Sequence, residues 1–534
     1  MDKIDIITAK VIGNRLKSIS ELMGEVLVRS AFSSNIKERR DCSTAVFDRK
    51  GRLMAQAEHI PLHLGSMMGI VREVIRQFGK DINPEDVFIA NDPYYGGTHL
   101  PDVTIVSPFF KGKKLMNFAA NIAHHSDIGG ARPGGIAGDA ASIYEEGLRI
   151  PPVKLVRAGK TDKNLLNFIV KNCRVPLERE TDLKAQIATN KIGIRYLNEL
   201  YARYGVKVVE NAVEKLLSYT GKRLRAKIKK IPDGRYLFED KLDDDGISDE
   251  PVPIKVCIEV KGKNLEVDFS GTGSQSRGAI NVVRSALLAT VYYSIKAFLD
   301  PGLPANEGLA EVLSIKAPPG SIVNPDEPAA VGARTDTCQR VAGVLIGAFN
   351  KAMPEKAVSG SNDASTAIVL SKEDKFVYVE AIGGGAGASE SGDGLDGVQV
   401  HVTNTSNLPI EVLESEFPLR VLKYELIPDS GGKGKYRGGL GIRRKIKILE
   451  DNVLFSSHGD RHKFPPRGWN GGESGKTGKF LINGKRISSK CSGIVLSKGD
   501  VIIIETPGGG GFGDKKGRPK RLMEKDVRDG KMSW

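Results

Sequence analysis

Three of the eight histidines of this 534-residue chain lie in two neighbouring segments that also carry aspartates. The segments are NDPYYGGTHLPDVTIVSPFF (residues 91–110) and NFAANIAHHSDIGG (residues 117–130). Imidazole nitrogens and carboxylate oxygens, with no thiolate among them, suit Mn²⁺, Zn²⁺ or Fe²⁺. The clustering indicates a divalent metal site. HxxD spacing is not specific, however, and each histidine could instead be a hydrogen-bonded core residue.

Local sequence signals predict how the two segments present these side chains. Pro101 cannot donate a hydrogen bond to a β-ladder, so a strand is expected to begin at Asp102 and to leave His99 in the preceding loop. In the second segment, the two-residue alternation of a strand places His124 on the inward face and His125 on the opposite face. If the two strands pair, His99, Asp102 and His124 converge.

Asp41 is the candidate for a further oxygen ligand, which mixed imidazole and carboxylate sites commonly need unless a water completes them. It lies in NIKERRDCSTAVFD (residues 35–48), where a β-hairpin is expected to begin. Two arginines precede it directly, so an ion pair with Arg39 or Arg40 is the alternative interpretation if no metal binds.

Three other motifs do not support the chemistry that they resemble. GGESGKT (residues 471–477) would need a glycine at position 470 to be a phosphate-binding loop, but Asn470 stands there and no strand precedes it. GGGGFGD (residues 508–514) lacks the strand-then-helix setting of a dinucleotide site and is expected to be a turn packed closely on another backbone. Ser126 and His125 are adjacent on a strand and point to opposite faces, which disfavours a nucleophile and base pair.

The composition is that of an ordinary globular protein of more than one domain. A length of 534 residues exceeds what one hydrophobic core usually supports, so two to four domains are expected. The net charge is +14, but the basic residues are dispersed among acidic ones and no basic stretch is interleaved with aromatic residues. Nucleic-acid binding is therefore not expected. No apolar run approaches the length of a membrane span, and MDKIDIITAK lacks the features of a signal peptide, so we expect a cytoplasmic protein.

The elements that must position the candidate site follow from hydrophobic periodicity. Helices are expected at 5–31 and 63–79, on either side of a hairpin in CSTAVFDRKGRLMAQA, and helical spacing dominates from 161 to 230. Alternating strands begin near 231, two further helices follow, and short strands with glycine-rich turns fill 420–514. The fold class is therefore mixed α and β and multi-domain. We predict an N-terminal metal-site domain (1–230), a mixed α/β domain (231–420) and a β-rich C-terminal module with a short terminal helix (421–534).

The chain resembles the hydantoinase B/5-oxoprolinase family over essentially its whole length. The stretches that carry the resemblance are NIKERRDCSTAVFD, QAEHIPLHLGSM, NDPYYGGTHLPDV, AHHSDIGG, EEGLRIPPVKL, NPDEPAAVGARTDTCQR, WNGGESG and TPGGGGFGD. The family includes metal-bearing subunits of ketone carboxylases and of a caprolactamase.

The resemblance implies a ligand set for the metal ion. In the family, the metal is held at positions that correspond to Asp41, His99, Asp102 and His124. Other recurrent positions of the family fall on residues whose roles the resemblance does not assign, and these are candidates for catalysis or for support of the ligands: His63, Asn91, Asp92, His125, Asp127 and Glu146.

The resemblance also implies an activity, which is the ATP-dependent opening of a cyclic amide such as 5-oxoproline, a hydantoin or a related lactam. In prokaryotes ATP is often bound by a separate hydantoinase A-like chain, which agrees with the missing phosphate-binding loop. The chain is thus expected to be one component of a hetero-oligomer of (AB)n type. Two alternatives stay open, which are a subunit of an ATP-dependent ketone carboxylase and a non-catalytic scaffold for the ATP-binding chain.

Overall fold

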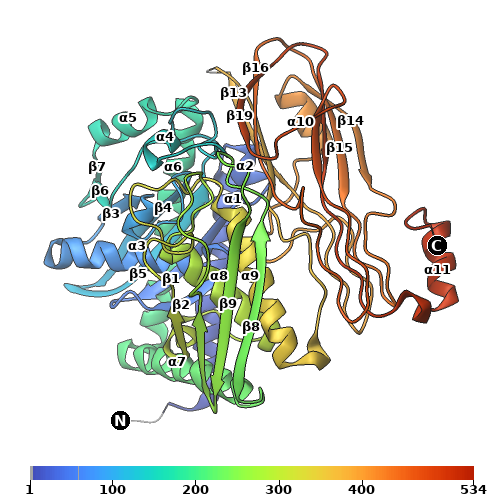
Figure 1. The fold of residues 1–534 in the computed structure, drawn as a ribbon. Helices are drawn as coiled ribbons and strands as arrows, with labels where there is room; N and C mark the ends of the chain where they lie inside the picture. Colours follow the sequence, from blue (N-terminus) through green and yellow to red (C-terminus); the bar gives the residue numbers. More distant parts are fainter. Residues whose placement is uncertain (1–3, 58, 374, 534) are drawn as a thin grey trace.

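The structure is a computed structural model that describes residues 4–57, 59–373 and 375–533. The part of the chain up to about residue 350 forms one side of the molecule, and the orange-to-red C-terminal strands form the other side (Figure 1). Helices and strands are mixed throughout and the strands form several sheets, so the predicted mixed, multi-domain fold class is confirmed.

The N-terminal region is built on a seven-stranded sheet in the order β2-β1-β5-β4-β3-β6-β7. Its strands are β1 (Cys42–Asp48), β2 (Leu53–Ala57), β3 (Val87–Ala90), β4 (Asp102–Lys111), β5 (Lys114–His124), β6 (Val153–Arg157) and β7 (Lys160–Thr161). Its pairings are all antiparallel, and the expected hairpin is β1 and β2.

Helices cover both faces of this sheet, as the alternation of its side chains requires. The helices α1 (Ile6–Ser30) and α6 (Pro176–Tyr204) share a core with Val46 and Ala119 on one face. On the other face α3 (His63–Phe78) packs on Phe47, Phe118 and their neighbours. Burial of both faces holds β4 and β5 in one register, because a slip of one residue would exchange the two apolar sets.

The predicted start of β4 and the predicted pairing are confirmed. β4 begins at Asp102, directly after Pro101, and Asp102 lies opposite His124, the last residue of β5. The two strands therefore end together, and the loop with His99 lies at the same edge of the sheet.

The middle of the chain adds helices and a second sheet. The helices are α5 (Lys163–Lys171), α6, α7 (Val206–Ile228), α8 (Arg284–Leu299) and α9 (Arg334–Ala352). The sheet has the order β11-β10-β9-β8 and consists of β8 (Gly234–Leu242), β9 (Val252–Lys261), β10 (Asn264–Asp268) and β11 (Leu313–Lys316). α9 packs against β8 and β9 on one side and against α8 on another. The helical stretch and the strands after residue 231 are as expected.

The C-terminal region contains two sheets that enclose a common apolar core. One has the order β13-β12-β16-β19, with β12 (Thr366–Lys372), β13 (Phe376–Ile382), β16 (Val453–His458) and β19 (Cys491–Leu496). The other has the order β14-β15-β20-β17-β18, with β14 (Leu419–Leu426), β15 (Ile442–Ile448), β17 (Lys479–Ile482), β18 (Lys485–Ile487) and β20 (Val501–Glu505). β12, which lies before residue 420, pairs with β16, which lies after it.

Short helices complete the described structure. They are α2 (Ser34–Lys37), α4 (Ile143–Glu146), α10 (Ile410–Glu416) and α11 (Lys520–Arg528), together with 3₁₀ turns at Gly79–Asp81, Pro93–Tyr95, Glu307–Val312, Pro354–Lys356 and Lys515–Gly517. Among the described residues, no helix combines the length and the apolarity needed to span a bilayer.

Glycines let several backbones approach closely at one end of the C-terminal sheets. A Cβ atom at Gly509 would lie 2.0 Å from the carbonyl oxygen of Ala386, and one at Gly510 would lie 2.1 Å from that of Arg467. Both distances are far below van der Waals contact. GGGGFGD thus packs closely on other backbones as expected, although residues 508–511 form an irregular segment rather than a turn.

The close packing predicts that Gly510→Ala destabilises the C-terminal region strongly. The added methyl group must displace backbone rather than a flexible side chain, and overpacking costs about 1–3 kcal/mol or more. Gly392→Ala is the matched control, because a Cβ atom there meets nothing within 4 Å. Thermal unfolding of the full chain should show a lower melting temperature for Gly510→Ala alone, and equal melting temperatures for the two variants would contradict this packing.

Candidate metal centre

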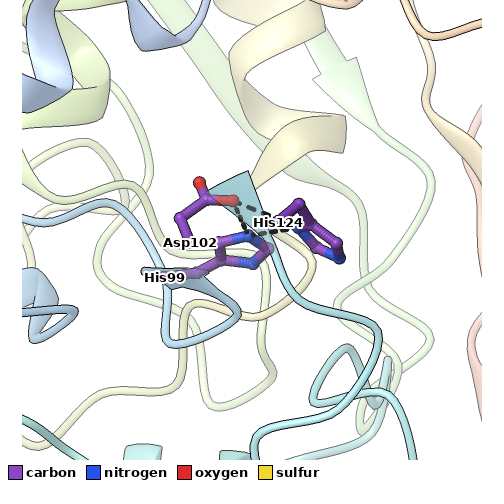
Figure 2. A group of neighbouring side chains, drawn as sticks. All are labelled: His99, Asp102 and His124. Carbon is purple, nitrogen blue, oxygen red and sulfur yellow. Dashed lines mark hydrogen bonds and ion pairs between the residues drawn. The ribbon is translucent and has the colours of Figure 1, made fainter. Parts of the chain in front are cut away.

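Three buried side chains converge where β4 begins and β5 ends (Figure 2). His99 Nε2 lies 2.9 Å from Asp102 Oδ1, and His124 Nδ1 lies 3.1 Å from the same oxygen. The two imidazole nitrogens are 3.1 Å apart. The strand pairing that the sequence predicts therefore brings His99, Asp102 and His124 together, and these three residues are called the His–Asp–His group below.

The spacing of these three atoms fits the coordination of one shared metal ion. Two donor atoms that bind one ion at about 2.1 Å and at right angles to each other lie about 3.0 Å apart. Three lone-pair-bearing atoms at this mutual distance repel one another unless a proton or a cation lies between them. Within the described residues, this is the group of histidine, cysteine and acidic side chains whose atoms are close enough to hold an ion.

Burial and charge keep His99 and Asp102 in the protonation states that a metal requires. Burial, together with the positive charge of Arg334, lowers the pKa of His99 to about 3. Burial would raise the pKa of Asp102, but His99 and Arg334 and the hydrogen bonds from the imidazoles lower it well below its usual value. Neutral imidazoles and an ionised carboxylate are the forms that coordinate metal ions.

Arg334 and Thr98 fix the orientation of the Asp102 carboxylate. Thr98 Oγ1 and Arg334 Nη2 each donate a hydrogen bond of 2.7 Å to Oδ2, so that Oδ1 faces the two imidazoles. Arg334 is the first residue of α9 and is 3% exposed. The sequence analysis did not single out Arg334, although it lies within the stretch NPDEPAAVGARTDTCQR.

Glu146 holds the loop that leads into α9. Its Oε1 accepts hydrogen bonds from the backbone amides of Val331 (2.8 Å) and Gly332 (2.6 Å). Burial raises its pKa to about 8, although the two amides lower it. This candidate therefore contacts the loop that carries Arg334 rather than the His–Asp–His group.

Asp41 lies outside the His–Asp–His group but lines the cavity that adjoins this group. Its backbone oxygen accepts a 3.0 Å hydrogen bond from the amide of His124, and its side chain lines the cavity. Arg39 donates to Asn35 Oδ1 and to the carbonyl of Val379, whereas Arg40 faces a glutamate of α1. Within the described part of the chain, neither arginine forms the ion pair with Asp41 that was the alternative interpretation.

His63 and His125 lie on different sides of the group. His63 lines the cavity, where its Nδ1 is 3.0 Å from Ser43 Oγ and its Nε2 is 3.9 Å from Asp102 Oδ2. His125 Nε2 is 3.0 Å from Gln186 Oε1 on α6, and burial and nearby Arg179 lower its pKa to about 4. The structure thus places His124 and His125 on opposite faces of the strand end, as the alternation predicted.

The remaining candidates bind backbone amides and arginines away from the cavity. Asp127 accepts hydrogen bonds from the amides of Gly129, Gly134 and Arg174 and from the guanidinium of Arg174. Asp92 accepts from the amide of Tyr94 and from Arg149, and the side chain of Asn91 bonds to the backbone at residues 100, 148 and 150. These contacts shape the loops around the site.

The cavity next to the group has a volume of about 70 Å³ and is formed by distant parts of the chain. Asp41, His63 and the His–Asp–His group line it from the N-terminal sheet, and Arg334 lines it from α9. The strands β12 and β13 supply apolar residues, and His458 at the end of β16 lies in the same wall. No motif surrounds His458 in the sequence, and the sequence analysis did not single it out.

A family model described as hydantoinase B/oxoprolinase matches residues 5–515. The chain belongs to this family. The resemblance noted in the sequence is thereby confirmed.

Relatives within the hydantoinase B/oxoprolinase family match nearly the whole chain. An uncharacterised protein of Methanocaldococcus jannaschii is 42% identical, with 99% of this chain and 94% of the relative covered. A putative D-/L-hydantoinase subunit of Pseudomonas sp. NS671 is 33% identical (99% and 93% covered). A 5-oxoprolinase of Dictyostelium discoideum is 35% identical over 96% of this chain, which spans only 41% of that longer protein.

Two solved structures share the fold. An ATP-dependent caprolactamase from Pseudomonas jessenii superimposes with a TM-score of 0.92 at 30% identity, with 100% of this chain and 95% of the other covered. An acetone carboxylase, in its nucleotide-free structure, superimposes with a TM-score of 0.90 at 17% identity, with 98% and 78% covered. The second likeness concerns the fold alone.

The position of Glu146 predicts a pH-dependent difference between the wild-type protein and Glu146→Gln. The folded-state pKa of about 8 exceeds the ordinary 4.5, so the folded state retains a proton that the unfolded state releases. The stability that Glu146 contributes is therefore present below pH 4.5 and is lost as the pH rises through 8. Glutamine mimics the neutral carboxyl group and has no such loss.

Melting temperatures of the two proteins should accordingly be similar near pH 5 and should diverge toward pH 8. At pH 8 we expect Glu146→Gln to be the more stable by an amount on the order of a few kcal/mol. If the melting temperatures of the two proteins changed with pH in the same way across this range, Glu146 would not be protonated in the folded protein.

Proposed function

We propose that this chain is the metal-bearing subunit of a two-component, ATP-dependent cyclic amide hydrolase. It would open 5-oxoproline, a hydantoin or a related lactam, and ATP would be bound by a separate hydantoinase A-like chain. The observation that carries the proposal is the convergence of His99, Asp102 and His124 beside a cavity of about 70 Å³. Membership of the family and the fold shared with a caprolactamase support the reaction class.

In this proposal Asp41, His99, Asp102 and His124 hold a divalent ion, which is Mn²⁺, Zn²⁺ or Fe²⁺. The donor set of imidazole and carboxylate fits these ions, and Asp41 lines the same cavity as the other three residues. When bound, such an ion polarises an amide carbonyl or activates water. The chain itself keeps Asp102 ionised through Arg334 and Thr98, and its apolar strands β12 and β13 limit access of bulk water.

The surroundings of GGESGKT support an ATP site on another chain. Residues 472–478 are irregular and lead into the strand β17, so the segment lacks the strand before it and the helix after it that a phosphate-binding loop requires. The 5-oxoprolinase from Dictyostelium is more than twice as long as the part that this chain spans, and the Pseudomonas relative is named as a subunit. Both facts favour a partner chain and a hetero-oligomer of (AB)n type.

A ketone carboxylase subunit is the second candidate function. The fold shared with acetone carboxylase favours it, since one scaffold accommodates both reactions. Uptake of labelled bicarbonate into an acid-stable product, dependent on a ketone, distinguishes it from lactam hydrolysis. A scaffold without catalytic function would need no cluster of buried, correctly ionised ligands, so the His–Asp–His group disfavours it.

The two-component proposal predicts that the isolated chain shows neither ATPase nor lactam hydrolysis. Co-expression and co-purification with a hydantoinase A-like chain should give both activities, measured as phosphate release and ring opening over a panel of 5-oxoproline, hydantoins and caprolactam. ATP turnover by the isolated chain at a rate equal to that of the complex would refute the separate ATP site.

The ligand set predicts opposite outcomes for two adjacent histidines. His124→Ala should lose its bound metal and reduce the activity of the complex by more than the roughly 10- to 100-fold that loss of a supporting residue costs. His125→Ala is the matched control, because His125 faces Gln186 instead of the cavity, and it should retain the metal. His99→Ala and Asp41→Asn should resemble His124→Ala.

Elemental analysis of the purified variants, with circular dichroism to verify folding, measures this directly. A metal-free His125→Ala beside a metal-replete His124→Ala would reverse the assignment. Full metal occupancy in Asp41→Asn would reduce the set to three residues.

A further inference from the structure

His458 faces the same cavity as the His–Asp–His group but comes from the opposite side of the molecule. It is the last residue of β16 in the C-terminal region and is 3% exposed. The cavity of about 70 Å³ has room for a few water-sized groups between the two walls. An imidazole there is close to whatever occupies the cavity without being part of the tight ligand group, whose members are His99, Asp102 and His124.

Asp336 fixes the tautomer and the orientation of His458. Its Oδ2 lies 2.9 Å from His458 Nδ1, and its Oδ1 accepts a 2.9 Å hydrogen bond from the amide of Ser365. Both carboxylate oxygens are thus engaged, and an ionised Asp336 requires the proton of the neutral imidazole to reside on Nδ1. Nε2 then carries the lone pair, and the structure gives it no hydrogen-bond partner among the described residues.

This is the arrangement of a proton-transfer histidine, in which a carboxylate orients the ring and leaves the far nitrogen to react. We propose that His458, held by Asp336, transfers the proton in the ring-opening reaction. The inference rests on the proposed function and deepens it, because it assigns the catalytic base and acid of the same cavity. Asp336 is a positioning residue, since it acts through His458.

Each proton that moves in this step has a donor and an acceptor. Water adds to the amide carbonyl carbon while His458 Nε2 accepts one of its protons. The carbon–nitrogen bond then breaks, and the proton passes from Nε2 to the ring nitrogen that leaves. The products are a carboxylic acid and an amine, which near neutral pH ionise to a carboxylate and an ammonium ion, and His458 returns to its neutral form.

Charged groups surround His458 on every side of the cavity. Those that line it are Arg39, Asp41, His63, the His–Asp–His group and Arg334, and Lys490 interacts electrostatically with Asp336. Because several of these groups bear on its protonation, the pH profile must be measured on metal-replete protein with kcat as the readout.

The test uses the complex with the ATP-binding chain and the variants His458→Asn and Asp336→Asn. The side-chain amide that His458→Asn introduces can still donate to Asp336 from the position of Nδ1, so the tie between β16 and α9 is kept while Nε2 is lost. In Asp336→Asn the amide group donates to Nδ1 and moves the imidazole proton to Nε2, which removes the base without removing the ring. His462→Asn is the matched control, since His462 is also a buried histidine of the C-terminal region but lies outside this cavity.

We expect His458→Asn and Asp336→Asn to retain bound metal and melting temperature and to lower kcat by about 10²- to 10⁴-fold. The kcat–pH profile of His458→Asn should lack one limb that the wild-type profile shows. His462→Asn should keep the wild-type profile.

Two results overturn the proposal for His458 alone, and a third, different result is failure of the proposed function. If wild-type complex opens lactams and His458→Asn does so with an unchanged kcat–pH profile, His458 transfers no proton. If His458→Asn loses its metal, His458 is a ligand. If the wild-type complex opens no cyclic amide, the function itself is wrong and the role of His458 is withdrawn with it.

Discussion

The site depends on how one buried carboxylate is neutralised. Asp102 is 1% exposed, and an unpaired charge at such a position would cost several kcal/mol. Its two oxygens have different partners. Oδ2 accepts hydrogen bonds from Arg334 and Thr98, whereas Oδ1 lies next to the imidazoles of His99 and His124. The guanidinium favours the ionised form of Asp102 and also lowers the pKa of the nearby His99 imidazole.

This requirement links parts of the chain that are distant in sequence. Arg334 reaches Asp102 because α9 begins beside the first residue of β4. Glu146, from the N-terminal region, holds the loop before α9. From the C-terminal side, Arg39 bonds to the carbonyl of Val379, and Asp336 of α9 bonds to His458 of β16. Polar ties thus connect the three regions around the cavity, with apolar residues of β12 and β13 between them.

The polar side chains of the site lie mainly at the boundaries of strands and helices, whereas the larger apolar cores lie within the sheets and helices. The charged and imidazole side chains that face the cavity include those at the start of β4, the ends of β5 and β16 and the start of α9, and apolar core residues of β12 and β13 line it as well. Side chains at strand ends can vary with little cost to those cores. The shared fold of a caprolactamase and an acetone carboxylase is consistent with this separation of scaffold and site.

The sequence by itself determined the local features, namely the start of β4 after Pro101, the faces of His124 and His125, the hairpin, the long helices and the family. These follow from periodicity and from the missing amide proton of proline, which act over a few residues. It also sufficed to bring together His99, Asp102 and His124, because β4 and β5 are consecutive strands. Only the tertiary structure decided that Arg334 neutralises Asp102, 232 residues away, and that His458 faces the same cavity. Such contacts leave no local signal, since they arise from the packing of whole sheets and helices, which sets the partner of each buried charge.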